Sequence, residues 1–487
     1  MSEPTAEAQH AEAQHADALH APPPPVDGGF WDSIREALRG SHRDFTDGSV
    51  SRAILVLAVP MVLEMIMESV FAVCDVFFVA KLGASAVATV GLTESWLTLV
   101  YALAMGVAIA ASALVARRTG ERDREGAAHA GGQAVLVGLC IALAIGVVGG
   151  TLAPRMLSVM GASQDIITTG TTYARIMLGG NATIVMLFLI NAIFRGAGDA
   201  AIAMRVLWLA NAINILLGPC LIFGLGPFPK LGVTGAAIAT NIGRGTGVLF
   251  ALSRLLKPGS RIDIHARHLR VDFAVIKRIA RLAWSAAFQI LIGMGSWIAL
   301  TRLIATFGSS VLAGYTIGYR VIIFGLLPAA GLANAAATMV GQALGAKKPE
   351  RAEQAVRIAG MYNMAVLSVV GALLAIFAPW IARFFTPDPA IIPSAASTMR
   401  IVACGFPFYA WGMVISQSFN GAGDTRTPTL LNVFVFWLWE IPLAYVLADW
   451  VGLGPRGVYF AMTIAFSTLA VASALVFRRG TWKVKRV

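Results

Sequence analysis

Charge is scarce in this chain. Of its 487 residues only 13% are Asp, Glu, Lys or Arg, whereas soluble domains carry about a quarter. Apolar residues make up 57%, so too few polar side chains are present to cover a surface in water. These two values exclude an ordinary soluble protein and predict that most of the chain lies in a lipid bilayer.

Several kinds of catalytic or cofactor site are missing as well. The four cysteines fall singly inside apolar stretches, which excludes a disulfide scaffold or thiolate metal site and predicts small core residues (Cys74, Cys140, Cys220 and Cys404). No histidine falls in a predicted span, and neither a His-Glu-x-x-His pattern nor a Gly-x-x-x-x-Gly-Lys-Ser/Thr phosphate loop occurs. We therefore predict that the chain is not an enzyme, that it holds no metal or cofactor, and that it has no ATP-driven motor of its own.

Long apolar stretches are what the chain does contain. Crossing the hydrocarbon core takes about 20 apolar residues, and we identify twelve such stretches, six in each half. All should be α-helices, because an unpaired backbone amide finds no water inside a bilayer. The twelve predicted spans begin near residues 53, 91, 131, 169, 201, 233, 279, 313, 357, 395, 428 and 456. The fold class is therefore an all-α membrane protein.

Basic residues are divided unevenly between the two sets of connections. If the N-terminus is cytoplasmic, the inner connections hold the basic stretches 117–124, 254–281, 347–351 and 478–486, and the outer ones hold few Lys or Arg. The positive-inside rule then places both termini in the cytoplasm. We interpret the net charge of +12 as this topology signal and not as nucleic-acid binding.

The two halves of the chain are copies of one another. A shift of 225 residues places residues 194–199 (FRGAGD) on residues 419–424 (FNGAGD), and it pairs further glycines, including Gly83 with Gly308 and Gly232 with Gly457. An even number of spans per copy gives both copies the same orientation in the membrane. We expect two parallel six-helix bundles related by an axis along the membrane normal.

Composition divides the chain into five parts. Residues 1–45 are predicted to be a disordered cytoplasmic tail, in which residues 30–38 could form a short amphipathic helix at the membrane interface. The N-terminal bundle covers residues 46–256 and the C-terminal bundle residues 276–480, joined by a basic cytoplasmic linker, residues 257–275. Residues 481–487 are predicted to be a cytoplasmic tail.

Three acids lie in the first span. At about 100° per residue, Glu64, Glu68 and Asp75 fall within about 40° of one another on a helix, as an acidic stripe. Burial and like charge raise the pKa of such carboxylates, so they can exchange protons near neutral pH. The same oxygens could instead coordinate Na⁺, or the acids could be paired with buried arginines such as Arg175 or Arg244 and only hold helices together.

Two further residues of the spans stand out. Pro60 cannot donate a helix hydrogen bond, so we expect the first span to bend there. Glu440 lies in the eleventh span beside Trp437 and Trp439, whereas its counterpart in the first half is Ile215. An acid beside aromatic rings can recognise an organic cation, although a helix-packing role is the alternative.

Taken together, these features resemble one known family. The twelve spans, the duplication, the FRGAGD and FNGAGD loops, and the stretches LGASAVATVGL and VGQALGAKKPERA resemble the multidrug and toxic compound extrusion (MATE) family over about residues 50–480. The resemblance implies two six-helix bundles that form a V around a central cleft. It also implies a monomer of the plasma membrane, in bacteria the inner membrane, that exports organic cations and other toxic compounds by alternating access in exchange for H⁺ or Na⁺.

The first span is similar to that of the DinF-like branch of the family, more than to the NorM-like branch. Asp75 falls where that branch has an essential acid, Pro60 falls where it bends the helix, and Asn191 and Asn214 match polar positions of its N-terminal bundle. The resemblance implies that these residues bind the coupling cation. One departure is that Gly218 stands where those relatives carry a second acid.

Glu64 or Glu68 would take the place of that missing acid, a hypothesis that favours H⁺ over Na⁺ as the coupling ion. NorM-like members have an acidic pair in the C-terminal bundle, for which Gln289 and Glu440 are partial matches here, and we predict that Gln289, Trp437 and Glu440 contact substrate. The alternatives are Na⁺-coupled transport of the same substrates and a related lipid-linked oligosaccharide flippase. A flippase would need a strongly cationic cleft, which the acidic stripe disfavours.

Overall fold

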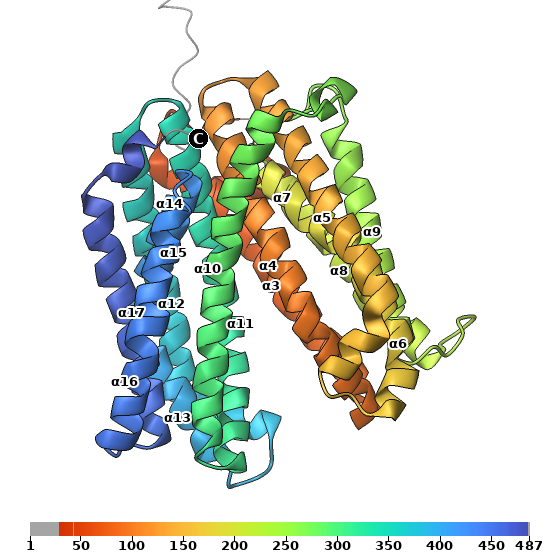
Figure 1. Ribbon diagram of the computed structural model, residues 1–487. Helices are drawn as coiled ribbons and strands as arrows, with labels where there is room; N and C mark the ends of the chain where they lie inside the picture. The colour runs from red at the N-terminus through yellow and green to blue at the C-terminus, as the bar shows by residue number, and fades with distance from the viewer. Residues whose placement is uncertain (1–28, 42, 486–487) are drawn as a thin grey trace, which may run out of the picture.

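The computed structural model describes residues 29–41 and 43–485. All regular structure within these residues is helical (Figure 1). The first half contains α2 (Phe30–Arg39), α3 (Val50–Ala80), α4 (Ala84–Gly120), α5 (Arg124–Val159), α6 (Gln164–Gly179), α7 (Ala182–Gly196), α8 (Ala200–Phe223) and α9 (Val233–Leu255). The second half contains η1 (Ala266–Leu269), α10 (Phe273–Ala305), α11 (Ser309–Gly345), α12 (Pro349–Phe385), α13 (Ile392–Ala403), α14 (Phe406–Gly421), α15 (Arg426–Asn432), η2 (Val433–Glu440), α16 (Ile441–Tyr445), η3 (Val446–Trp450), α17 (Pro455–Arg478) and η4 (Thr481–Val484).

These helices make the twelve passes that the sequence predicts. Among the described residues ten helices are long and apolar enough to cross a membrane, or eleven when α13 and α14, bent by 58°, count as one span. The twelfth is α9, a helix of 23 residues. It is less apolar because Asn241 and Arg244 lie in its middle.

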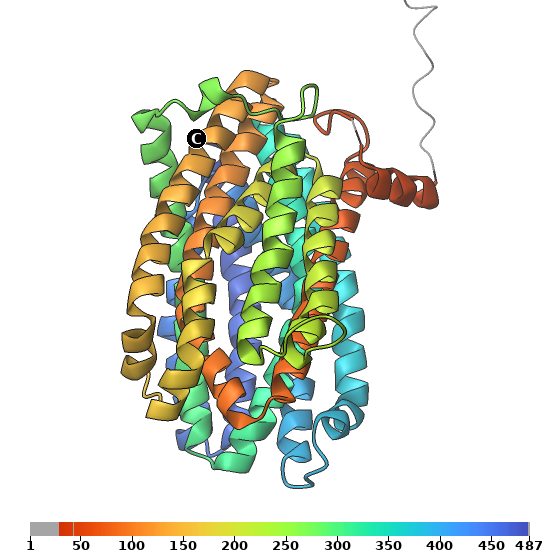
Figure 2. The same ribbon diagram turned by 90° about the vertical axis from the view of Figure 1, so that its right-hand side faces the viewer.

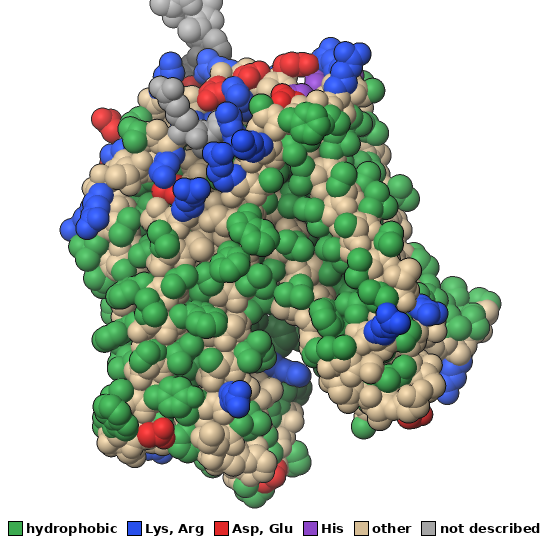
Figure 3. Space-filling model, in the orientation of Figure 1, with side chains coloured by type: hydrophobic (Ala, Val, Ile, Leu, Met, Phe, Trp, Pro, Cys, Tyr) green, Lys and Arg blue, Asp and Glu red, His purple; other side chains and the backbone are tan. Residues whose placement is uncertain are grey.

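Two bundles are arranged as a V, as expected. Helices α3 to α9 form the N-terminal bundle and α10 to α17 the C-terminal bundle (Figure 1). The bundles meet at the end where the C-terminus lies and where Lys and Arg side chains gather, and they part toward the other end, where the space-filling view shows a cleft (Figure 3). We call these the joined end and the open end.

Two helices belong to both bundles. The first half of α3, through Ile54, Leu57 and Met61, packs into one core with residues of α11, α12 and α14. Helix α10 does the reverse, because Ile279 and Ala283 belong to the core of the N-terminal bundle. Residue 276, the predicted start of the C-terminal bundle, falls in the first turn of α10, whose first part packs in the N-terminal bundle. The first half of α3 is thus buried in the C-terminal bundle, and its second half carries the acidic stripe in the N-terminal bundle.

Glycines let the two halves touch at the joined end. A Cβ atom on Gly120 would overlap the carbonyl oxygen of Gln342, and one on Gly345 would overlap the carbonyl oxygen of Arg117. Residues 117 and 342 are themselves 225 apart, so this is one contact repeated by the two copies. Helices α4 and α11 approach backbone to backbone because neither glycine has a side chain.

The copies leave the 225-residue register before their last helix. Helix α9 follows Gly232 with φ 57°, and α17 follows Gly454 with φ 56°. Gly235 and Gly457 also match, since each lies against the backbone of the preceding span. The predicted pairing of Gly232 with Gly457 is therefore wrong, because the second copy is three residues shorter in this connection.

Part of the predicted N-terminal tail is ordered. Residues 1–28 lie outside the described part of the chain. Residues 29–41 include α2, which projects sideways from the bundle near the joined end, roughly perpendicular to the spans (Figure 2). Glu36 pairs with Arg52 of α3 at 2.9 Å, and Phe45 is buried. The predicted boundary at residue 45 is wrong because the apolar residues of this segment find a surface to pack on.

The C-terminal residues are packed in the same way. Trp482 of η4 is fully buried, and its ring stacks on Phe477 with the centroids 4.6 Å apart. Arg117 of the N-terminal bundle donates to the carbonyl oxygen of Lys485 at 3.1 Å. Up to residue 485 the predicted tail is therefore a structural part of the joined end.

Residues 43–49, which we call the clasp, bridge both bundles at the joined end. Arg122 of the α4–α5 turn pairs with Asp44 at 3.1 Å and with Asp47 at 3.4 Å. Lys348 of the α11–α12 turn pairs with Asp47 from the other side. Arg122 and Lys347 are repeat copies, and both have positive φ, 60° and 59°. The same unusual turn thus presents basic residues to the clasp from each half.

The prediction that the cysteines are core residues is wrong. Cys140 and Cys404 are exposed, and Cys74 and Cys220 are partly buried. A small apolar side chain is tolerated at a lipid-facing surface. All four thiols are free.

Candidate functional site

Glu64 of α3 forms an ion pair with an arginine. Arg195 of α7 donates from Nη1 to Glu64 Oε1 at 2.6 Å, and Asn191 Nδ2 donates to the same oxygen at 3.4 Å. Asn191 and Arg195 lie one helical turn apart, so both face α3. Glu64 is buried, and its Oε2 has no hydrogen-bond partner among the described residues. Arginine pairing is therefore the arrangement found for this acid, with Arg195 as the partner and not Arg175 or Arg244.

Glu68 lies one turn further along α3 and faces α8 and α9. Asn211 Nδ2 donates to Glu68 Oε2 at 3.0 Å, and Arg244 Nη2 lies 4.0 Å from Oε1. Arg244 is buried, and its Nη1 donates to the Tyr101 hydroxyl at 2.9 Å. The charge of Glu68 is thus also compensated inside the bundle.

Asp75 differs from the other two acids. It is partly exposed, and it makes no hydrogen bond or ion pair with any residue in the described ranges. It interacts electrostatically with Arg244, which attracts it, and with Glu94 of α4, which repels it. Its carboxylate therefore remains available to a proton, a cation or water.

The remaining residues of the predicted cation site lie apart from the acids or play another part. Asn214 Nδ2 donates to Thr240 Oγ1 at 2.8 Å and so links α8 to α9. Pro60 is internal to α3, which is one continuous helix. A Cβ atom on Gly331 of α11 would lie 2.7 Å from the backbone of Met61. Pro60 therefore lies where α3 passes from one bundle into the other.

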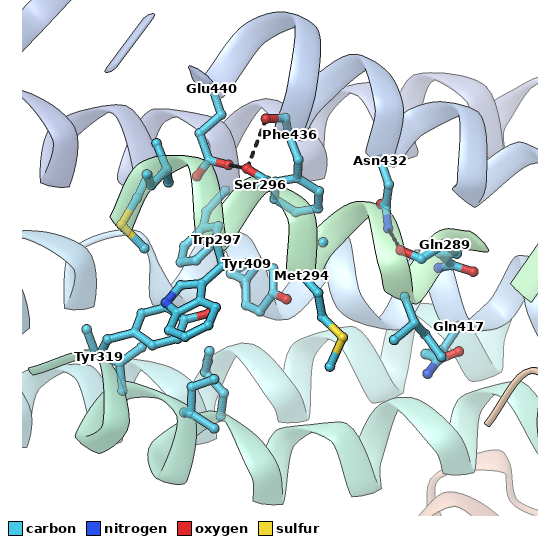
Figure 4. Close-up of a pocket in the computed structure, with 18 of the residues that line it drawn as sticks. Gln289, Met294, Ser296, Trp297, Tyr319, Tyr409, Gln417, Asn432, Phe436 and Glu440 are labelled. Carbon is cyan, nitrogen blue, oxygen red and sulfur yellow. Dashed lines mark hydrogen bonds between the residues drawn. The ribbon is translucent and has the colours of Figure 1, made fainter. Parts of the chain in front are cut away.

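A second candidate site is a cavity of about 550 Å³ in the C-terminal bundle, which α4 of the other bundle borders through Met105 and Ile109. Figure 4 shows its lining. Glu440 lies at one end, near the rings of Trp297, Tyr319 and Tyr409, and the side-chain amides of Gln289, Gln417 and Asn432 gather at the other end. The cavity thus has a charged aromatic end and a neutral polar end.

Glu440 is held by few groups. Its Oε2 accepts from Ser296 Oγ at 2.8 Å, and Ser296 also donates to the carbonyl oxygen of Phe436 at 3.0 Å (Figure 4). Glu440 is buried, with no cationic side chain paired to it among the described residues. It ends the π-helical segment η2, and Pro442, which lacks an N–H and would clash with the preceding turn, explains why the helix widens there.

The structure brings together two of the three predicted substrate residues. Gln289 and Glu440 both line the cavity, and Gln289 Oε1 is buried without a hydrogen-bond partner among the described residues. Trp437 does not line the cavity. Its indole N–H donates to the carbonyl oxygen of Ile292 at 2.9 Å, and 47% of the residue is exposed. The aromatic rings near Glu440 in the cavity are therefore those of Trp297, Tyr319 and Tyr409, on other helices, and not those of its sequence neighbours Trp437 and Trp439.

Comparison with known proteins gives one consistent result. The MatE family matches residues 60–220 and 285–446, which are the two copies of the repeat. The chain belongs to the MatE family.

Individual relatives agree over nearly the whole length. Probable multidrug resistance protein YoeA of Bacillus subtilis is 26% identical over 445 residues, 90% of this chain and 96% of YoeA. Probable multidrug resistance protein NorM of Thermotoga maritima is 24% identical over 444 residues, 90% of this chain and 94% of NorM. A solved structure, the outward-facing conformation of a multidrug resistance MATE family transporter, matches with a TM-score of 0.85 and 28% identity, covering 91% of this chain and 98% of that one. The protein is an integral membrane transporter with the twelve-helix MATE fold.

Membership of the MatE family does not place the chain in one branch. The similarity of its first span to the DinF-like branch stays a prediction. The two acids proposed to replace the one missing at Gly218, Glu64 and Glu68, are both already engaged by residues of α7, α8 and α9.

Sequence reasoning missed three charged residues of this MatE transporter. Glu94 of α4 and Arg320 of α11 come from opposite halves, are exposed, and attract one another electrostatically. Ionisable residues at membrane depth are functional candidates by default, and applying that rule to the second and eighth spans would have found both. The arginine partner of Glu64 was missed because the FRGAGD motif suggests a loop, whereas Arg195 is in the last turn of α7.

Proposed function

We propose that this MatE transporter is a secondary active antiporter that exports organic cations by alternating access in exchange for H⁺. The joined end, which holds the basic residues, faces the cytoplasm. The cleft of this structure then opens to the outside. In this proposal the C-terminal cavity takes the organic cation and Asp75 takes the proton.

The observation that carries the proposal is a buried carboxylate in an aromatic cavity. Glu440 has Ser296 as its hydrogen-bond partner, so a cationic ligand would compensate a charge that the protein leaves without a basic partner. Trp297 and Tyr319 stack with their ring centroids 5.4 Å apart beside it. Aromatic faces attract cations of many shapes, which suits a carrier of several compounds. Met294 adds an adaptable apolar wall.

Asp75 supports coupling to H⁺. It is the acid of the α3 stripe that keeps no hydrogen bond with a described residue, so it can gain and lose a proton without breaking a pair. Arg244 of α9 attracts its carboxylate, and Glu94 of α4 repels it. Na⁺ would need several oxygen ligands around one point, whereas Oε1 of Glu64 accepts from Arg195 and Asn191, and Oε2 of Glu68 accepts from Asn211.

A lipid-linked oligosaccharide flippase fits these contacts less well. Its pyrophosphate group would need unpaired cations in the cleft. The arginines paired with the α3 stripe are Arg195, which is partly buried, and Arg244, which is buried, and Glu64 and Glu68 compensate them. The favoured ligand is therefore a cation.

Transport by the purified protein in liposomes tests this proposal. A fluorescent organic cation is present at equal concentration on both sides of the membrane, and a pH gradient or a Na⁺ gradient is imposed, one at a time, at zero membrane potential. We expect the pH gradient alone to drive accumulation of the substrate on one side, against its own gradient. Movement driven by the Na⁺ gradient alone would show that Na⁺, and not H⁺, is the coupling ion. If neither gradient drove movement, secondary active transport of that compound would be overturned.

A further inference from the structure

A second hollow, of about 440 Å³, lies at the joined end. Its lining comes from the clasp, the α4–α5 turn, the FRGAGD turn, the basic linker and α11, so both halves of the chain contribute. We call it the arginine pocket. The residues that matter for its chemistry are Arg43, Asp44, Arg122, Arg124, Arg261 and Gln342.

Two of the four arginines have acidic partners. Arg43 pairs with Glu36 at 2.9 Å, and Arg122 pairs with Asp44 at 3.1 Å. Asp44 is the one acid in the lining and also accepts hydrogen bonds from Thr46. These contacts leave the charge of the other two arginines uncompensated by direct pairing.

Arg124 and Arg261 have no carboxylate partner within hydrogen-bond distance among the described residues. Arg124 makes no hydrogen bond or ion pair with the residues that the structure describes. Arg261 donates to the carbonyl oxygen of Gly198 at 2.7 Å and to that of Arg43. Burial lowers the pKa of Arg261, the charges of Asp199 and Asp44 oppose this, and repulsion from Arg124 adds to it.

The backbone adds positive potential to the same place. Arg124 and Ala127 lie in the first turn of the 36-residue helix α5, and both line the pocket. The N-terminal end of a helix carries a partial positive charge, so a cation there is unfavourable and an anion is favourable. The Thr119 hydroxyl adds a hydrogen-bonding group to the lining, whereas Ser260 Oγ and Gln342 Nε2 already donate to backbone carbonyl oxygens.

We propose that the arginine pocket binds a phosphate-bearing anion, with Arg124 and Arg261 as its principal contacts. Guanidinium groups match the oxygens of phosphate in pairs of hydrogen bonds. Asp44 in the lining and Asp199 beside Arg261 would repel the ligand, but Arg122 pairs with Asp44, and Thr46 donates hydrogen bonds to it. The phosphate group belongs either to a soluble cytoplasmic compound or to the headgroup of an anionic lipid.

Occupancy of the pocket has a consequence for transport. Gln342 belongs to α11 of the second half and donates to the carbonyl oxygen of Gly196 in the first half at 2.9 Å. The pocket therefore exists as a whole only while the joined end is closed. A ligand that binds one conformation better shifts the population toward it, so the anion stabilises the conformation with a closed joined end.

Calorimetric titration with inorganic pyrophosphate tests the site without reference to transport. The full-length protein is placed in nanodiscs of neutral lipid at fixed ionic strength. We expect saturable binding, weakened about tenfold by Arg124→Gln, which is the loss of roughly one charge-assisted contact. Arg254→Gln is the matched control, because Arg254 lies in the last turn of α9 outside the pocket. Absence of saturable pyrophosphate binding, or equal weakening by both variants, would overturn the site.

A second series distinguishes the two sources of phosphate. In nanodiscs that contain phosphatidylglycerol, a headgroup in the pocket would abolish pyrophosphate binding and raise the melting temperature of the wild-type protein but not of Arg124→Gln. Unchanged pyrophosphate binding in the same discs assigns the pocket to a soluble compound. Arg124→Lys keeps the charge without the paired donors and should give an intermediate affinity; an affinity equal to that of Arg124→Gln would contradict a charge-based site.

Discussion

Arg195 Nη1 donates to Glu64 Oε1 at 2.6 Å and so joins α7 to α3 inside the N-terminal bundle. Both side chains are largely shielded from solvent, and a buried charge that loses its partner is costly. The pair lies just beyond the point where α3 enters the C-terminal bundle core through Met61. The ion pair therefore fixes α3 to the N-terminal bundle directly after the segment of α3 that packs in the core of the C-terminal bundle.

Removal of the Glu64 charge should destabilise the fold. Glu64→Gln leaves Arg195 without its acid, and we expect the free energy of unfolding to fall by about 3 kcal/mol. Glu64→Gln combined with Arg195→Gln should lose less than the sum of the two single variants, because neither charge is then left alone. Thermal unfolding in detergent measures all three. Additive losses would show that the pair makes no net contribution.

Asp75→Asn should act on coupling instead. Because Asp75 has no hydrogen-bond partner to lose among the described residues, we expect the unfolding temperature of the Asp75→Asn protein to stay within about 2 °C of that of the wild type. Transport driven by a pH gradient in liposomes should be abolished. Asp165→Asn, in the first turn of α6, is a matched control that should leave transport unchanged. Unchanged H⁺-driven transport by Asp75→Asn would remove this residue from the coupling role.

Glu440→Gln should separate cationic from neutral substrates. The variant keeps the size of the side chain and an acceptor for Ser296, but it removes the charge that faces the aromatic rings. We expect the affinity for an organic cation to fall about tenfold and that for a neutral substrate of similar shape to be unchanged. Fluorescence titration measures both. Equal losses for the two substrates would assign Glu440 to helix packing, and Asp449→Asn, in η3, controls for a general effect of charge.

Much of this fold could be predicted because the lengths of the apolar stretches and the internal duplication can be recognised in the sequence. The twelve spans, the two bundles and the V follow from them. The sequence could not show that α3 and α10 each pack into the core of the opposite bundle. Met61 packs with residues of α11 that are far away in the sequence, and no local pattern specifies such a contact. The sequence also predicted the acidic stripe but not which acid is free: Arg195 and Asn211 are far away in sequence, and they decide that Glu64 and Glu68 are engaged and Asp75 is not.

The glycine contacts at the joined end give a prediction about conformation. A Cβ atom on Gly345 would overlap the carbonyl oxygen of Arg117, and overpacking of this kind costs about 1–3 kcal/mol. Gly345→Ala should therefore shift the population toward conformations in which the joined end is open. Distances between spin labels on the α4–α5 and α11–α12 turns report this shift. Gly91→Ala is the control, because nothing lies within 4 Å of a Cβ at Gly91; an identical distance distribution for Gly345→Ala and the wild type would contradict the prediction.

The clasp should resist physiological changes of pH. Burial alone would raise the pKa of Asp44, but hydrogen bonds from Thr46 and the nearby Arg122 lower it below its usual value. A carboxylate with a lowered pKa keeps its contacts above its ordinary pKa of about 4 and loses them only as the pH falls through the lowered value. The same spin-label distances should therefore be constant between about pH 8 and 6 when Asp75 is replaced by Asn.

Substitution tests the clasp directly at constant pH. Asp44→Asn with Asp47→Asn removes the acids that hold Arg122 and Lys348 together across the two halves. Partly exposed ion pairs are each worth about 0–1 kcal/mol, so the double variant should raise the open population at the joined end by a few-fold and not abolish the closed one. Asp32→Asn, on α2, is the matched control for lost acidic charge. If the double variant and this control gave the same distances, the clasp would be a surface contact without influence on the joined end, and closure would depend on other contacts, such as the glycine contacts between α4 and α11 and the hydrogen bond from Gln342 to Gly196.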